Sequence, residues 1–316
     1  MSEFGATSTA DEVLQGIDLS GRTVFITGGY SGLGAETARA MADRGAHLIL
    51  SGRDRTQLES TAIDLANRTG ARVETLACDL ASLASIRAAG AEAAGRFDRI
   101  DLLINNAGVM ACPFMRTADG FEMQFGTNHL GHFLLTSQLM PLVRAGSNQR
   151  IVNLSSRGHH IDRVHLDDPN YATREYEKWQ AYGQSKTANV LFSVGLEMQL
   201  ADEGIHAFAL HPGGIQTNLG RHMSVEDMAA LLKRIEQSSG APAQFKTIPQ
   251  GAATTCWVAT ATELEGRGGL YAEDCHIAEV DDASPTGGVR SYAIDPATAD
   301  ELWTLSEELV GQPFAA

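Results

Sequence analysis

The chain has 316 residues and a formal net charge of −15, with 43% hydrophobic and 20% charged residues. This is the composition of an ordinary globular protein, long enough for one large domain or two small ones. The negative charge argues against binding to nucleic acids or anionic membranes, because both would repel it. A ligand that carries phosphates must therefore be held by a local group of residues.

The N-terminal segment and the cysteines favour a cytoplasmic protein. Residues 1–18 are polar and acidic, without the regions of a signal peptide, and we expect them to form an extension. No apolar run approaches the roughly 20 residues that span a bilayer. Cys78, Cys112, Cys256 and Cys275 show no paired spacing, so we expect reduced thiols and no metal site.

Apolar runs alternate with amphipathic stretches along residues 19–316, which predicts βαβ units. No linker interrupts the pattern, so we expect an α/β fold: a single Rossmann-like domain, doubly wound around a parallel sheet with helices on both faces. The predicted strands are 23–27, 47–51, 72–77, 100–105, 149–155, 205–211 and 269–272. The predicted helices are 33–44, 55–69, 83–95, 127–144, 181–201 and 296–310.

Two segments depart from this alternation. Residues 157–180 are polar and charged and precede the helix of Tyr182. Residues 219–250 contain an amphipathic segment that a packed surface helix would explain. Its place just after the Pro212-Gly213 turn, beyond the sixth strand, favours a substrate lid instead. The apolar positions of this lid region are Met223, Met228, Leu231, Leu232 and Ile235.

A glycine-rich turn follows the first predicted strand. Glycine lets the backbone approach a pyrophosphate, and the N–H groups at a helix start favour its charge. The spacing Gly-x3-Gly-x-Gly differs from the commoner dinucleotide fingerprint, and alone it also fits a structural turn. Between a strand and a helix it predicts a dinucleotide site formed by Gly28, Tyr30, Ser31, Gly32, Leu33 and Gly34.

The end of the second strand bears on the choice between NAD and NADP. An acidic residue there would bond the ribose hydroxyls of NAD and repel the 2′-phosphate of NADP. This chain has Arg53, which can pair with that phosphate. The alternative is a solvated arginine that opens the next helix, and Asp54 stands beside it. We expect NADP(H) to be preferred and NAD(H) to be possible.

Tyr182 and Lys186 lie one helical turn apart, a spacing that alone fits any amphipathic helix. With the glycine-rich turn, Asn105-Asn106-Ala107-Gly108 and Ser155-Ser156 in this order, the chain resembles the short-chain dehydrogenase/reductase family over residues 19–309. The strings 128–136 and 185–192 are most similar to retinol dehydrogenase-like and WW-domain oxidoreductase-like members. The resemblance implies further cofactor contacts from Asp79, Leu80, Asn106, Ala107, Gly108, Pro212, Gly213, Ile215 and Thr217.

The resemblance and side-chain chemistry together predict a catalytic set. A tyrosine with a pKa near 10 is a poor acid or base at neutral pH unless a cation stabilises its phenolate. We expect Lys186 to lower the pKa of Tyr182 in this way. By resemblance, both also hold the nicotinamide ribose, and Ser156 bonds the substrate oxygen. Asn128 is implied to hold a helix distortion and a water that relays protons.

The sequence thus predicts an NADP-preferring oxidoreductase that interconverts a carbonyl and an alcohol on a small, fairly apolar substrate, with Tyr182 as general acid/base. Two alternatives stay open: reduction of an activated C=C bond by the same groups, and a non-catalytic protein that senses NADP(H). Oligomers are common in the resembling family, so a homo-oligomer is a further expectation. His159-His160 fits the border of a substrate pocket and a surface loop equally well.

Overall fold

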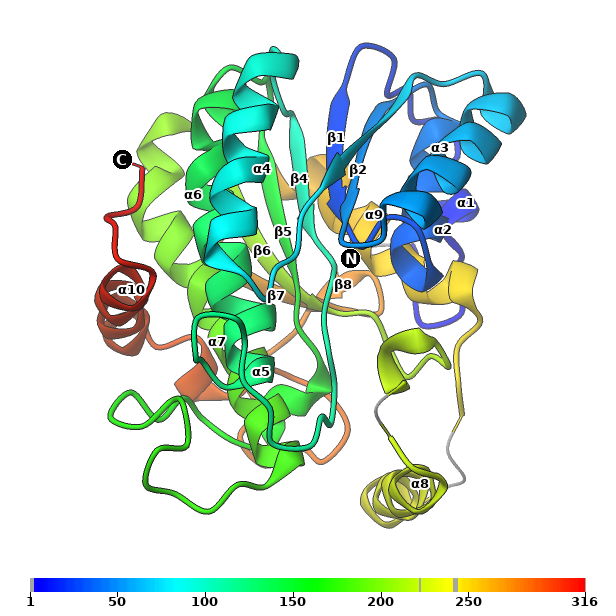
Figure 1. Ribbon diagram of the computed structural model, residues 1–316. Coiled ribbons are helices and arrows are strands. Elements are labelled where there is room, and N and C mark those ends of the chain that lie inside the picture. Colours follow the sequence, from blue (N-terminus) through cyan, green and yellow to red (C-terminus); the bar gives the residue numbers. More distant parts are fainter. Residues whose placement is uncertain (1–2, 222, 241–243, 316) are drawn as a thin grey trace.

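Seven parallel strands form the centre of the computed structural model, which describes residues 3–221, 223–240 and 244–315 (Figure 1). The sheet order is β3-β2-β1-β4-β5-β6-β7-β8, with only the last pair antiparallel. The order reverses between β1 and β4, where a doubly wound sheet opens a crevice at the carboxyl ends of its strands. The strands are β1 (Thr23–Thr27), β2 (His47–Gly52), β3 (Val73–Ala77), β4 (Leu102–Asn105), β5 (Arg150–Leu154), β6 (His206–His211), β7 (Leu270–Glu273) and β8 (His276–Ile277).

Helices cover both faces of this sheet, which confirms the predicted fold class. Strands β1, β4 and β5 are buried along their whole length, as expected for a sheet covered on two sides. One layer contains α1 (Ala10–Val13), α2 (Gly32–Ala42), α3 (Arg55–Thr69) and α9 (Ile248–Thr260). The other contains α4 (Leu83–Arg96), α6 (Gly131–Arg144) and α7 (Lys178–Leu200), with α10 (Pro296–Val310) packed outside α7.

Three elements were not predicted from the sequence. Strand β8 adds an antiparallel edge to a sheet expected to be wholly parallel. Helix α9 begins with a capping box in which Thr247 and Gln250 bond each other's backbone N–H groups. Helix α1 lies inside the expected N-terminal extension, where Ala10 and Leu14 are fully buried in the core. These apolar residues tie the segment to the α2–α9 layer.

The predicted helix 127–144 is interrupted. A short α5 (Met123–Phe125) leads into the π-helical turn η1 (Gly126–Leu130), and α6 follows without a break. Such turns shift the helix register and are frequent at functional sites. The remaining short helices are the 3-10 turns η2 (Arg157–His160), η3 (Ala201–Glu203), η4 (Asn218–Gly220), η5 (Thr262–Leu264) and η6 (Ser291–Ala293).

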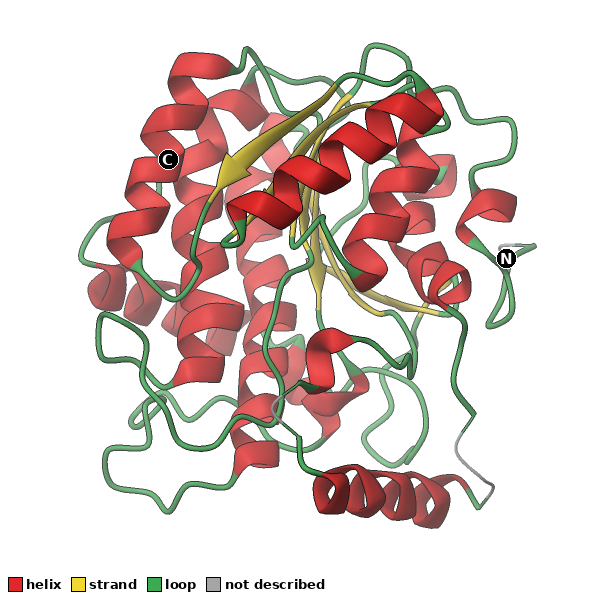
Figure 2. Ribbon diagram, turned by 45° about the vertical axis from the view of Figure 1, so that its right-hand side comes forward, coloured by secondary structure: helices red, strands yellow, loops and turns green. Residues whose placement is uncertain are grey.

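Helix α8 (Val225–Ser239) lies apart from both helical layers (Figure 2). The two ends of the segment that carries α8 are joined by a backbone hydrogen bond, in which Lys246 N donates to Gly214 O over 2.8 Å. In the first turn of α8, the Asp227 carboxylate pairs with the Lys178 ammonium at the start of α7. Positions 222 and 241–243 of the predicted lid region lie outside the described residues. Among the described residues, no helix has the length and apolar character that crossing a membrane requires.

Candidate active site

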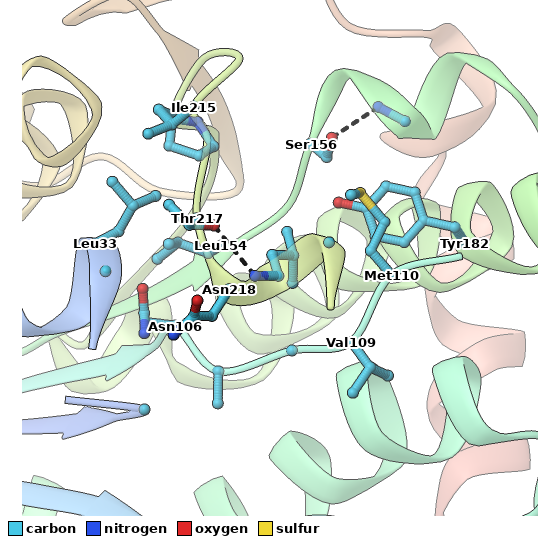
Figure 3. Close-up of a pocket in the computed structure, with 18 of the residues that line it drawn as sticks. Leu33, Asn106, Val109, Met110, Leu154, Ser156, Tyr182, Ile215, Thr217 and Asn218 are labelled. Atoms are coloured by element: carbon cyan, nitrogen blue, oxygen red, sulfur yellow. Dashed lines mark hydrogen bonds between the residues drawn. The ribbon is translucent and has the colours of Figure 1, made fainter. Parts of the chain in front are cut away.

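A cleft of about 1060 Å³ opens at the carboxyl ends of β1, β2, β4, β5 and β6. The glycine-rich turn and the end of β2 line one part of it, and the inward side of α8 lines another. Tyr182, Lys186 and Ser156 line the same cleft. Figure 3 shows Ser156 and Tyr182 on the side away from Leu33. Every residue predicted to bind the cofactor or act in catalysis lines this cleft except Gly34 and Asn128, which lie behind its wall.

The glycines of the turn have distinct geometric roles. Gly28 and Gly32 have φ values of 66° and 53°, a left-handed backbone that favours glycine. Gly34 is helical, but a Cβ there would lie 2.4 Å from Gly28 O and 2.6 Å from Asn106 Nδ2. Ser31 precedes the first turn of α2 and makes no side-chain cap. The N–H groups at this helix start are therefore open to an anion.

The end of β2 presents an uncompensated cation. No hydrogen bond or ion pair joins Arg53 to another described residue, and its side chain lines the cleft. The neighbouring Asp54 caps α3 instead, accepting from the backbone N of Gln57 over 3.0 Å. The Ser51 hydroxyl lines the same region and is buried without a hydrogen-bond partner among the described residues. These features fit the adenosine ribose and phosphate of a dinucleotide.

Lys186 is buried in α7 with 4% of its surface exposed. Its Nζ donates to Leu154 O over 2.8 Å and to Asn189 Oδ1 over 3.2 Å, and it lies 5.8 Å from the centroid of the Tyr182 ring. Burial in this setting lowers the pKa of Lys186 to about 7. Leu154 ends β5 and lines the cleft, so the ammonium is held at the end of that strand.

Ser156 and Tyr182 face one another across Gly158 (Figure 3). A Cβ on Gly158 would lie 2.7 Å from Tyr182 Cε1 and 3.4 Å from Ser156 Oγ, so no side chain fits between them. Burial raises the pKa of Tyr182 to about 12, and the Ser156 hydroxyl acts in the opposite direction. Lys186, which we expected to lower this pKa, is not among the groups that shift it; its Nζ donates to Leu154 O.

Asn128 lies in the π-helical turn, where the resemblance implied a distortion. Its Oδ1 accepts from Val109 N over 2.9 Å, and its Nδ2 donates to Ser185 Oγ over 2.9 Å. Its carbonyl accepts from Asn189 Nδ2 over 2.8 Å. Asn128 therefore joins the loop after β4 to α7 on both sides of Lys186.

The far part of the cleft is lined by residues that the sequence analysis did not select. They are apolar and come from separate segments, so no local pattern distinguishes them from core positions. His160 also lines the cleft, whereas His159 is fully buried behind Ser156. Among the described residues, no three His, Cys, Asp or Glu side chains gather as metal ligands would. These apolar residues include Met110, Met123, Ile161, Trp179 and Pro285, while Leu219, Arg221 and Phe245 line the cleft from the predicted lid region.

Comparison with known proteins agrees with this geometry. Residues 22–227 match the model of the short chain dehydrogenase family. The chain belongs to the short-chain dehydrogenase/reductase family. It is 40% identical to the chloroplastic short-chain dehydrogenase TIC 32 B of Brassica napus, over 98% of this chain and 95% of that one. It is 38% identical to human retinol dehydrogenase 14, over 93% and 87% of the two chains. The predicted retinol dehydrogenase-like branch is thereby confirmed.

Solved structures give the same result. A crystal structure of a protein from Mycobacterium paratuberculosis superposes with a TM-score of 0.73 and 35% identity, covering 98% of this chain and 99% of that one. A Pseudomonas aeruginosa protein, solved as an active-site complex with NADP, superposes with a TM-score of 0.62 and 26% identity over 80% and 94% of the chains. This short-chain dehydrogenase/reductase is therefore an oxidoreductase that uses a nicotinamide dinucleotide.

Replacing Gly34 with alanine should abolish tight cofactor binding, because the new methyl group would collide with the backbone of the glycine-rich turn. The dissociation constant, measured by cofactor fluorescence, should rise at least about tenfold, and the fold should survive. The matched control is Gly95→Ala in α4, where a Cβ meets nothing within 4 Å. That variant should bind normally and gain about 0.5–1 kcal/mol of stability. Unchanged binding by Gly34→Ala would contradict the assignment of the turn.

Proposed function

We propose that this protein is an NADP-preferring oxidoreductase that interconverts a carbonyl and an alcohol on a fairly apolar small molecule. The observation that carries the proposal is the place of Tyr182 and Ser156. Their side chains face each other at the junction between the glycine-rich turn and the apolar part of one cleft. A substrate oxygen bound there would meet a proton donor and a second hydroxyl at once.

The residues present fit a nicotinamide dinucleotide. When bound, the cofactor supplies or accepts the hydride. Gly28, Gly32 and the N–H groups at the start of α2 would hold its pyrophosphate, and the turn around Pro212 and Thr217 would hold its nicotinamide end. Asp79, Leu80 and the turn Asn106-Ala107-Gly108 line the intervening wall. All of these segments reach the cleft from strand ends, so the nicotinamide end of a bound cofactor would lie in the same cleft as Tyr182.

The protein's own residues then manage the proton. Tyr182 is protonated at neutral pH, because burial raises its pKa, and so it can donate to the oxygen of a carbonyl as it becomes an alcohol. Ser156 would bond the same oxygen and fix its position. The Lys186 ammonium, on the same face of α7, would restore the proton through the Asn128 region. In the reverse direction, Tyr182 accepts the proton from the alcohol.

Two cations support a preference for NADP. Arg53 has no partner among the described residues, and Arg221 lines the same cleft from the lid segment. Burial and the charge of Arg53 lower the pKa of Arg221, and both side chains line the cleft. An anion between them would relieve their repulsion. The Pseudomonas relative that superposes on this chain was solved with NADP.

The substrate part of the cleft supports an apolar ligand of some bulk. Its lining is rich in methionine and aromatic side chains, and methionine adapts to ligands of varied shape. Helix α8 contributes from the lid side, so the substrate would lie between α8 and the start of α7. The apolar lining residues are Met110, Met123, Ile161, Trp179, Met223, Met228, Leu231, Ile235 and Phe245.

Tyr182→Phe should reduce carbonyl turnover by at least about a thousandfold and leave NADPH binding unchanged, because only the proton donor is lost. The assay follows NADPH oxidation against a panel of aromatic, terpenoid, steroidal and aliphatic carbonyls. Tyr171→Phe is the control, since Tyr171 is also buried but lies outside the cleft. Turnover retained by Tyr182→Phe would refute the mechanism. Saturated ketone formed from an unsaturated one would indicate C=C reduction.

Arg53→Ala should raise the KM for NADPH about ten- to hundredfold and leave the KM for NADH nearly unchanged. A charged hydrogen bond contributes about 1.5–3 kcal/mol, and about 1.4 kcal/mol corresponds to a factor of ten. Arg55→Ala is the control, because Arg55 opens α3 nearby but does not line the cleft. Equal losses for both cofactors would show that Arg53 contacts a group that they share.

The two directions of reaction should depend differently on pH. With the Tyr182 pKa raised to about 12, the protonated form needed for reduction dominates at pH 6–9. The phenolate needed for oxidation increases about tenfold per pH unit over this range. The kcat/KM for reduction should therefore stay flat while that for alcohol oxidation climbs. A reduction rate that instead falls as pH passes 7 would follow the lowered pKa of Lys186 and assign the proton to that residue.

A further inference from the structure

The turn that follows Ser156 is held by residues from the far end of the chain. Ser156 caps the 3-10 turn η2, and its Oγ accepts from Gly158 N over 3.0 Å. Arg157 Nη1 donates to Thr286 O over 3.1 Å, and His160 Nε2 donates to Gly288 O over 3.0 Å. We call residues 286–292 the C-terminal strap. These bonds bind both ends of the turn to the strap.

His159 lies at the centre of this junction and is fully buried. The backbone N–H of Arg290 is 3.3 Å from His159 Nε2, and because an N–H can only donate, Nε2 is the acceptor. The ring proton therefore resides on Nδ1, which lies 2.7 Å from Ser156 O and donates to it. Burial lowers the pKa of His159 to about 3, so this pattern holds at neutral pH.

The main chain and the ring of His159 are fixed as well. Its carbonyl accepts from Thr187 Oγ1 over 3.2 Å and from Tyr292 Oη over 2.6 Å. Thr187 directly follows Lys186 in α7, so the residue joins the serine turn to the catalytic helix. The ring packs against the Tyr271 ring with a centroid distance of 4.7 Å. His159 thus has no free polar atom and little room to rotate.

We propose that His159 is a positioning residue that fixes the Ser156 hydroxyl opposite Tyr182. It acts through the Ser156 carbonyl and does not touch the substrate. Because Gly158 N bonds the Ser156 hydroxyl within the same turn, a rotation of the turn would move the carbonyl and the hydroxyl together. The inference deepens the proposed function and depends on it for the role of Ser156.

The alternative is that His159 only fills space in the core, and two variants separate these roles. His159→Phe keeps an aromatic ring but loses the side-chain donor to Ser156 O, which then keeps only the backbone N–H of residue 159, 3.0 Å away in the wild type. His159→Asn is smaller, yet its amide can replace Nδ1 as that donor. Both lose the acceptor for Arg290 N, so their difference reports the bond to Ser156. We expect a kcat lower by about ten- to hundredfold in the Phe variant, with KM little changed, and a loss below about threefold in the Asn variant.

A double-mutant cycle with Ser156→Ala tests the route of the effect. If His159 acts through Ser156, adding His159→Phe to Ser156→Ala should cost less than about twofold in kcat. If His159 acts only on packing, the two losses should multiply. The control is His206→Phe, since His206 Nδ1 bonds Glu197 over 2.9 Å at the start of β6, away from the cleft. It should change stability without changing kcat.

A measurement that needs no turnover separates this inference from the proposed function. Amide exchange of the peptide covering residues 155–161 reports the bond between Gly158 N and Ser156 Oγ. Exchange should be faster by about tenfold in His159→Phe and near wild type in His159→Asn. If wild type reduces no carbonyl but this difference appears, the proposed function fails and His159 still positions the turn. Equal exchange in wild type and His159→Phe, or a Phe variant as active as wild type, would overturn the inference.

Discussion

The active site depends on holding a lysine side chain inside the protein. An ammonium removed from water is costly unless hydrogen bonds replace those it loses. Lys186 donates to two acceptors, and no carboxylate of the described part of the chain forms an ion pair with it. Lys186 can reach both acceptors only if the end of β5 is fixed relative to α7, because one acceptor, Leu154 O, lies at the end of β5. The other, Asn189, also bonds the Asn128 carbonyl, so the π-helical turn is part of the same arrangement. Tyr182 lies one turn earlier on α7, so the contacts that fix Lys186 also fix the position of Tyr182.

Backbone geometry and a few cations can bind a phosphate-bearing ligand on a protein whose net charge is −15. The glycine-rich turn uses N–H groups, which carry no net charge and do not titrate. Arg53 and Arg221 line the cleft and add positive charge there. The opposite part of the cleft is apolar. The polar part of the cleft would therefore recognise the phosphate-bearing ligand, and the apolar part would recognise the other ligand. Tyr182 lies where the two parts meet.

Much of the fold and of the cofactor site could be predicted because their signals are local. The turn from Gly28 to Gly34 and the pair Tyr182 and Lys186 are short patterns, and apolar runs mark the strands. Helix α9 also had a local signal, the capping box of Thr247 and Gln250, which the analysis did not use. The substrate lining could not be predicted, because Met110 and its partners come from distant segments. The direction of the Tyr182 pKa shift depends on burial, which no local pattern gives.

His159 illustrates the same limit and has a consequence for how the protein is made. Its ring nitrogen and the Arg290 amide that it accepts from are separated by 131 positions in the chain. A chain still growing on the ribosome, with the segment through Thr217 exposed, already contains the glycine-rich turn, Tyr182 and Lys186. It lacks the strap that holds the serine turn. The surroundings of Ser156 are therefore completed only by residues near the C-terminus, which are the last to be synthesised.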